Sequence, residues 1–262
     1  MKNVERTCWI VDLGLIPYGP AFDLQHRLLE ARKSNAIPDV LLLCEHPHVI
    51  TLGRNGKREH LRAGSRLLEQ MHVAFHPTDR GGDITYHGPG QLVGYPIMNL
   101  TEYRRDVRWF VEQLEEIMIR SSADFGITGK RVEDRHGVWV ETAAGEEKLA
   151  ALGVHLSRWV TSHGFAYNVA TELRYFDLIV PCGIPDKRAT SLERLLARGV
   201  STEEVRPRIV AHFGEVFGCA TVPCSRAELE RRLGEVLPAS IPPASVNSMN
   251  FSQVGSPEEG AA

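Results

Sequence analysis

The stretch RGGDITYHGPGQ, residues 80–91, combines flexible backbone with polar side chains in a way that a packed core does not. It holds four glycines and one proline together with Arg80, His87 and Gln91. Glycine permits positive φ and close approach of the backbone to a ligand, while Pro89 fixes φ and removes a donor. A tight hairpin is the common use of such residues. The polar side chains that share the stretch favour instead a shaped loop that forms the wall of a binding site.

The composition of the 262-residue chain is that of a globular protein, with 43% hydrophobic and 24% charged residues. A net charge of -3, without long blocks of like charge, argues against nucleic acid or an anionic membrane as a partner. No signal-peptide pattern and no apolar stretch of about 18 residues occur, so we expect a soluble cytoplasmic protein. Five cysteines, an odd number without regular spacing, argue against a disulfide framework.

Hydrophobic periodicity predicts a chain in which strands come first and helices dominate the last third. Because consecutive strands are joined by short glycine-containing turns, we expect an α+β fold with a mixed, largely antiparallel β-sheet and packed helices. Residues 1–237 are expected to form a single domain, and residues 238–262 a disordered C-terminal tail. We predict helices at 21–33, 105–125, 191–196, 202–217 and 226–236, and strands at 7–13, 40–44, 49–52, 73–76, 84–87, 91–97, 138–141, 149–156 and 165–169.

Cys182 is the one cysteine in a setting that suggests chemistry, because Pro181 and Gly183 flank it and a turn must present it. A thiol is mostly protonated near neutral pH and needs a neighbouring cation or base to react. Lys148 and His163 are the candidates for that helper, and spacing does not choose between them. The other four cysteines are interpreted as structural.

The cluster Cys44-Glu45-His46-Pro47-His48 resembles a metal site at first sight. Alternation along a strand would place Cys44, His46 and His48 on one side. Pro47 bends the chain, however, and no distant set of ligands accompanies the cluster. We therefore predict no metal.

Three blocks in one order resemble the lipoyl(octanoyl) transferases, which share the catalytic-domain fold of biotin and lipoate protein ligases. The blocks are RGGDITYHGPGQ (80–91), KLAALGVHLSRWVTSHGFAYNV (148–169) and PCGI (181–184), and the resemblance covers roughly residues 7–215. It implies transfer of an octanoyl group from acyl carrier protein to a lysine of a lipoyl domain, in 2-oxoacid dehydrogenase complexes and the glycine cleavage H protein. It implies no cofactor.

The resemblance also implies roles for individual residues. Cys182 would be the nucleophile that accepts the acyl group, and Lys148 would lower its pKa and act as acid and base. His163 and Gln91 would support the site. The substrate-binding residues of the family match Arg80, Gly81, Gly82, Asp83, Ile84, Thr85, Tyr86, His87, Ala151, Leu152, Gly153, Gly164, Phe165 and Ala166.

Three other activities stay open on the sequence alone. An ATP-dependent lipoate or biotin ligase would adenylate a free acid and would need no cysteine nucleophile. A thioesterase would pass the acyl group to water. A non-catalytic acyl-binding protein would need neither Cys182 nor Lys148.

Overall fold

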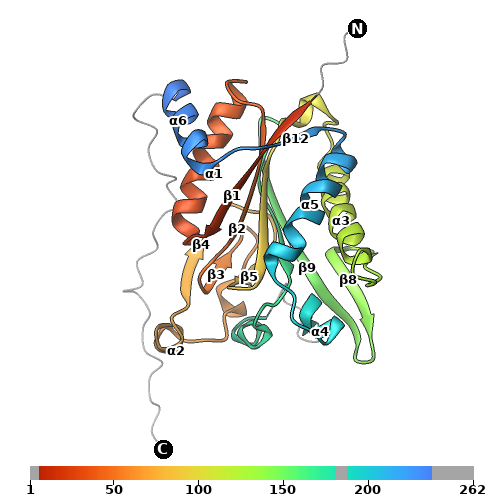
Figure 1. Cartoon of the computed structure of the whole chain (residues 1–262). Helices are drawn as coiled ribbons and strands as arrows, with labels where there is room; N and C mark the ends of the chain where they lie inside the picture. The colour runs from red at the N-terminus through yellow and green to blue at the C-terminus, as the bar shows by residue number, and fades with distance from the viewer. Residues whose placement is uncertain (1–5, 181–187, 238–262) are drawn as a thin grey trace, which may run out of the picture.

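The computed structural model describes residues 6–180 and 188–237, in which helices pack on both sides of a large β-sheet (Figure 1). The helices are α1 (Tyr18–Lys33), α2 (Ser65–Gln70), α3 (Val107–Ala123), α4 (Leu192–Leu196), α5 (Thr202–Phe217) and α6 (Arg226–Val236). The strands are β1 (Thr7–Leu15), β2 (Asp39–Glu45), β3 (Val49–Leu52), β4 (Ala74–Pro77), β5 (Ile84–His87), β6 (Gln91–Ile97), β7 (Lys130–Val132), β8 (Arg135–Thr142), β9 (Gly145–Ser157), β10 (Val160–Asn168), β11 (Arg188–Ala189) and β12 (Ala220–Pro223).

The larger sheet joins nine strands of the described chain in the order β12-β1-β2-β6-β10-β9-β8-β7, with β11 added to β9. Pairing is parallel between β12, β1 and β2 and between β11 and β9. The pairs from β2 through β6, β10, β9 and β8 to β7 are antiparallel. The predicted α+β class with a mixed, largely antiparallel sheet is therefore confirmed.

Two helix pairs cover the two faces of this sheet, α1 with α6 and α3 with α5 (Figure 1). One core cluster joins apolar residues of α3 and α5 to the sheet, and another joins those of α1 and α6. The apolar stripe predicted for 105–125 forms α3, whose start is capped by the Asp106 carboxylate accepting the Trp109 N–H. Ser201 caps α5 in the same way, because its side chain accepts the Glu204 N–H. The Glu204 carboxylate pairs with Arg198.

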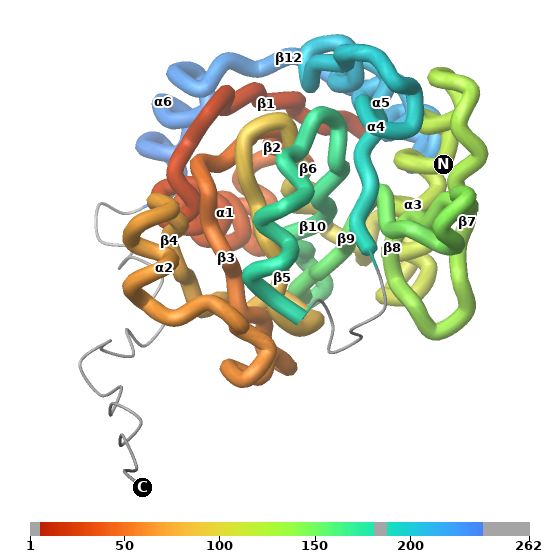
Figure 2. The backbone as a smooth tube through the Cα atoms, turned by 90° about the horizontal axis from the view of Figure 1, so that it is seen from below, coloured from red at the N-terminus to blue at the C-terminus, as the bar shows by residue number. Residues whose placement is uncertain are grey.

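A smaller sheet of β4, β3 and β5 lies beside the larger one and has its own apolar cluster (Figure 2). β3 pairs with β4 in parallel and with β5 in antiparallel orientation. The Gly81 N–H donates to the Val154 carbonyl of β9 at 2.9 Å, which ties the loop before β5 to the larger sheet. The glycine-rich stretch 80–91 therefore joins the two sheets.

The sequence missed several features of the described chain. Short elements, among them α2, β11 and β12, were not predicted, and β10 begins at Val160 where the prediction begins at residue 165. Residues 160–164 include Ser162 and His163, which read as polar, yet every residue of β10 is buried. The predicted tail, residues 238–262, lies outside the described residues, and no described helix has the length and apolar character needed to cross a membrane.

Candidate active site

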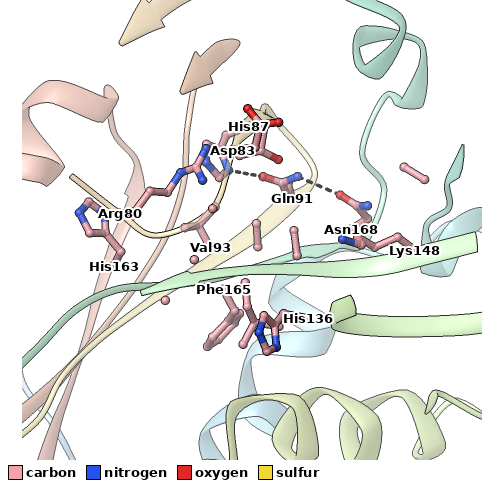
Figure 3. A pocket seen from close by; sticks show the side chains of 18 of the residues that line it. Arg80, Asp83, His87, Gln91, Val93, His136, Lys148, His163, Phe165 and Asn168 are labelled. Carbon is pink, nitrogen blue, oxygen red and sulfur yellow. Dashed lines mark hydrogen bonds between the residues drawn. The ribbon is translucent and has the colours of Figure 1, made fainter. Parts of the chain in front are cut away.

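A cavity of about 250 Å³ lies between the two sheets (Figure 3). Its walls come from the loop before β5, from β5 itself, from β6 and from the facing parts of β8, β9 and β10. The predicted site residues among its lining are Arg80, Gly82, Asp83, Ile84, Thr85, His87, Gln91, Lys148, Ala151, Leu152, Gly153, His163, Gly164, Phe165 and Ala166.

Gly81 and Tyr86 are the predicted binding residues that do not line the cavity. Gly81 acts through its backbone bond to β9, and a Cβ there would come within 3.0 Å of the Val154 oxygen. The Tyr86 side chain turns into the small apolar cluster, where its hydroxyl bonds His48 Nδ1 at 2.7 Å. Its ring stacks on Tyr175 with centroids 5.1 Å apart. Both residues hold the loop and β5 in place.

Arg80 fixes the loop with its guanidinium. Arg80 is 7% exposed, and its Nη2 donates to the Thr51 carbonyl at 2.8 Å and to Thr51 Oγ1 at 2.9 Å. Its Nη1 donates to the Gly81 carbonyl at 3.1 Å. Because several donors of one planar group are engaged, the orientation of Arg80 at the cavity is fixed by β3.

His87, Gln91 and Asn168 form a hydrogen-bonded chain across the cavity (Figure 3). His87 Nδ1 donates to Gln91 Oε1 at 2.7 Å, and Gln91 Nε2 donates to Asn168 Oδ1 at 2.9 Å. Burial lowers the pKa of His87 to about 3, so its imidazole is neutral near pH 7. His87 therefore lines the cavity with a neutral imidazole whose orientation is fixed.

His163 pairs with Asp79, its Nε2 lying 2.7 Å from Asp79 Oδ1. Burial raises the pKa of Asp79, but the hydrogen bond from His163 and the attraction of the nearby histidines together exceed that effect and lower the pKa to about 2. Because an ionised carboxylate only accepts, His163 donates from Nε2. Its Nδ1 is buried and has no partner among the described residues. Burial also lowers the pKa of His163.

Lys148 lies at the other end of the cavity from His163 (Figure 3). In the β9–β10 register His163 faces Val154, six positions along β9 from Lys148, or roughly 20 Å at the usual rise per residue. Lys148 and His163, the two candidates for activating the Cys182 thiol, are thus far apart. Lys148 Nζ lies 4.6 Å from the centroid of the Trp139 ring.

The predicted nucleophile Cys182 falls within residues 181–187, outside the described residues. The chain on the far side of that segment returns to the cavity, because Arg188 and Ala189 line it. Ala189 pairs with Lys148, and the Thr190 N–H donates to the Lys148 carbonyl at 2.9 Å. The chain shortly after Cys182 therefore runs beside Lys148.

The histidines of the apparent metal cluster are occupied by hydrogen bonds. His46 Nδ1 donates to the Ile16 carbonyl at 2.6 Å, and its Nε2 accepts from the Tyr95 hydroxyl at 2.7 Å. Burial lowers the pKa of His46 to about 4. Cys44 is fully buried beside it, with Sγ 3.6 Å from His46 Nε2. Neither ring nitrogen of His46 has a free lone pair for a metal.

Sequence reasoning missed several side chains that line the cavity. Trp139 and His136 come from β8, Tyr18 from α1, and Asn168 from the end of β10. Trp139 lies between two valines in the run GVWV, where alternation assigns it to the opposite face of its strand. That alternation was the available signal, whereas Tyr18 and Asn168 meet the cavity only through tertiary packing.

Residues 17–214 match the lipoyl protein ligase A/B catalytic domain. This match covers most of the chain, which therefore belongs to that family. An octanoyltransferase of Solibacter usitatus is 52% identical over 83% of this chain and 96% of its own length. An octanoyltransferase of Acidobacterium capsulatum is 47% identical over 80% of this chain and 89% of its own length. The chain is accordingly a transferase of the octanoyltransferase type.

Solved structures show the same fold at low sequence identity. A bipartite lipoate protein ligase from Thermoplasma acidophilum aligns with a TM-score of 0.69 at 16% identity, over 88% of this chain and 91% of that one. A lipoate-protein ligase A bound with ATP aligns with a TM-score of 0.66 at 14% identity, over 88% and 93%. The predicted fold family is thus confirmed.

Proposed function

We propose that this protein transfers an octanoyl group from octanoyl-acyl carrier protein to a lysine of a lipoyl domain, through a thioester on Cys182. The observation that carries the proposal is the pairing of Ala189, seven residues after Cys182, with Lys148, whose cation lines the cavity. A cation close to a thiol stabilises its thiolate. Lys148 is therefore assigned as the group that activates Cys182.

The reaction has two acyl transfers with Lys148 moving the protons. The Cys182 thiolate attacks the donor thioester carbonyl, the carrier thiolate leaves, and the Lys148 ammonium protonates it. The acceptor amine then attacks the Cys182 thioester and gives a proton to neutral Lys148, and the Cys182 thiolate leaves as the amide forms. Exchange between thioesters is nearly balanced and amide formation is downhill, so no ATP is consumed.

The cavity suits a short acyl chain. Its volume of about 250 Å³ lies just below the range of roughly 300–1,000 Å³ that is usual for ligand pockets. Leu152, Phe165 and Val93 supply apolar wall, and Ala151 and Ala166 leave room between them. Backbone N–H groups near the glycines are assigned to the oxyanion, each contributing on the order of 10²-fold in rate.

The proposed octanoyl transfer also assigns the protein partners. The donor is octanoyl-acyl carrier protein, and the acceptors are lipoyl domains of 2-oxoacid dehydrogenase complexes and the glycine cleavage H protein. We assign these reactions to the cytoplasm. Arg54 and Lys57, on the exposed loop after β3, are assigned to contact the carrier protein.

Intact-mass analysis after mixing with octanoyl-acyl carrier protein tests the covalent step. We expect a hydroxylamine-sensitive octanoyl adduct on Cys182 that disappears on addition of a lipoyl domain, which gains the group on a lysine. Cys182→Ser should abolish it. Cys219→Ser is the matched control, since burial raises the pKa of Cys219 to about 11 and its loss should change nothing. An enzyme that never forms the adduct, or one that labels the domain only from free octanoate with ATP, contradicts the proposal.

A further inference from the structure

Trp139 and Lys148 face each other across β8 and β9. The register places Trp139 directly opposite Lys148, so both side chains project from the same face of the sheet. Lys148 Nζ is 4.6 Å from the centroid of the indole ring, within the distance at which a cation is attracted to the face of an aromatic ring. Lys148 is half-buried, and partial removal from water strengthens such an attraction.

A β-bulge creates this pairing. Val138 lies opposite Ala150, and the next residue, Trp139, lies opposite Lys148, so Leu149 is the extra residue of β9. In a regular ladder Trp139 would face Leu149, which is fully buried in the main core together with Val138. Because of the bulge, the cross-strand partner of Trp139 is Lys148, which lines the cavity, and not Leu149, which lies in the core.

The indole ring is held in one orientation. Trp139 is 2% exposed, and its Nε1 donates to the Arg135 carbonyl at 3.2 Å. Val138 and Val140 on either side of it belong to the main core, whereas Trp139 lines the cavity. The Arg135 guanidinium also lies over the ring, but farther away, at 6.0 Å. Trp139 thus presents a fixed aromatic face to Lys148.

We propose that Trp139 is a positioning residue for the transfer reaction, holding the Lys148 ammonium over its ring so that Nζ is aimed into the cavity. The inference rests on the proposed role of Lys148 as acid and base. The contact with the ring orients the Lys148 ammonium, which transfers the protons. Loss of this orientation should therefore affect the chemical steps more than substrate binding.

Steady-state octanoyl transfer by Trp139→Tyr, Trp139→Phe and Trp139→Leu tests the catalytic consequence. We expect kcat to fall on the order of tenfold for Trp139→Leu, with the two aromatic replacements retaining more, and KM to stay within about twofold. Phe and Leu are both apolar, so a difference between them reports the aromatic face. Equal kcat values for the Phe and Leu variants, or a Leu variant as fast as the parent, would overturn the proposal.

Trp9→Leu is the matched control. Trp9 carries a comparable cation contact, with the Arg232 guanidinium 4.4 Å from the ring centroid, and it does not line the cavity. We expect this variant to keep the parent kcat. A loss equal to that of Trp139→Leu would mean that removal of any such tryptophan damages the fold, and the positioning role would be rejected.

Lysine-selective ¹³C NMR measures the contact independently of activity. The chain has six lysines, and the aromatic ring current should shift the Lys148 ε-methylene signal upfield. We expect that signal to vanish in Lys148→Arg and to return to the ordinary lysine position in Trp139→Leu. A parent spectrum without an upfield-shifted lysine contradicts the inference even if octanoyl transfer is found. The shifted signal in a protein without transferase activity would reject the proposed function alone.

Discussion

His87 illustrates how burial decides what a polar residue can do. It lies in the stretch that first indicated a binding site, and its imidazole is fully enclosed, with Nδ1 engaged by Gln91. A histidine in that environment is neutral at physiological pH and cannot carry a positive charge at the cavity. His87 therefore shapes the site, which leaves the proposed proton transfers to Lys148.

The lowered pKa of His87 predicts how stability depends on pH. The folded value is about 3, whereas the unfolded chain titrates near 6.5, so the unfolded state binds more protons between these limits. This contribution to stability is complete above pH 6.5 and declines as the pH falls toward 3, by about 1.4 kcal/mol per pH unit.

Urea unfolding at pH 7 and pH 5 measures that slope. His87→Gln should lose less stability between the two pH values than the parent protein does. The buried His46, with a pKa of about 4, adds a slope of the same sign in both proteins and cancels in the comparison. Identical pH dependence in parent and variant would contradict the assignment of a neutral His87.

Arg80→Lys tests the guanidinium that orients the loop. Lysine keeps the charge but cannot donate at once to the Thr51 carbonyl, Thr51 Oγ1 and the Gly81 carbonyl. We expect the free energy of unfolding to fall by about 1–3 kcal/mol and KM for the acyl donor to rise. Arg104→Lys is the control and should change neither quantity, because Arg104 is exposed and does not line the cavity.

Among the elements, most helices were predictable and strand partners were not. The bounds predicted for α5 and α6 agree with the structure, because capping serines and an apolar stripe are local signals. β10 was predicted too short, since a fully buried strand can hold polar residues such as Thr161 and His163 when their side chains find hydrogen bonds. The β9 bulge depends on packing of Leu149 and Ala150 in the core, and no local pattern indicates it.

The antiparallel pairing of β6 with β10, which places Phe165 opposite Gly94, predicts the effect of one added methyl group. A Cβ at Gly94 would lie 2.1 Å from the Phe165 ring, so in Gly94→Ala the ring must leave its place in the cavity wall. We expect a loss of about 1–3 kcal/mol in the free energy of unfolding and impaired octanoyl transfer. Denaturant unfolding and the transfer assay measure the two effects.

Gly234→Ala in α6 is the matched control for that substitution. Its added methyl group meets no atom within 4 Å, and alanine favours helix. Stability should stay equal or rise by up to about 1 kcal/mol. If Gly94→Ala behaved in the same way, the packing of Phe165 against the β6 backbone would not constrain the cavity.

In the complete fold, the order of the main elements and the fold class were predictable from the sequence, but the site required the tertiary arrangement. Lys148 and His163 are fifteen positions apart in sequence and equally plausible there, and only the register of β9 and β10 separates them. Trp139 and Tyr18 were absent from the predicted site because the place of Trp139 at the cavity depends on strand pairing and that of Tyr18 on the packing of α1. The role of Cys182 stays a prediction.

The single-domain prediction for residues 1–237 can be tested by truncation. A chain ending at residue 237 should keep the thermal midpoint of the full chain within about 2 °C and keep its kcat, because residues 238–262 hold few large apolar side chains that could join a core. Calorimetry and the transfer assay measure both. A large drop in either quantity would show that residues 238–262 contribute to the fold or the site.

The parallel pairing of β1 with β12 has a consequence for biosynthesis. β1 is synthesised long before β12, yet one of its two edges has to wait for residues 220–223, and α1 waits for α6 to cover it. Until then the nascent chain carries an open strand edge, the kind of surface that recruits other chains. Completion of this edge of the sheet is therefore a late event in folding, and substitutions that slow the docking of β12 should lower the soluble yield more than they lower the stability of the finished protein.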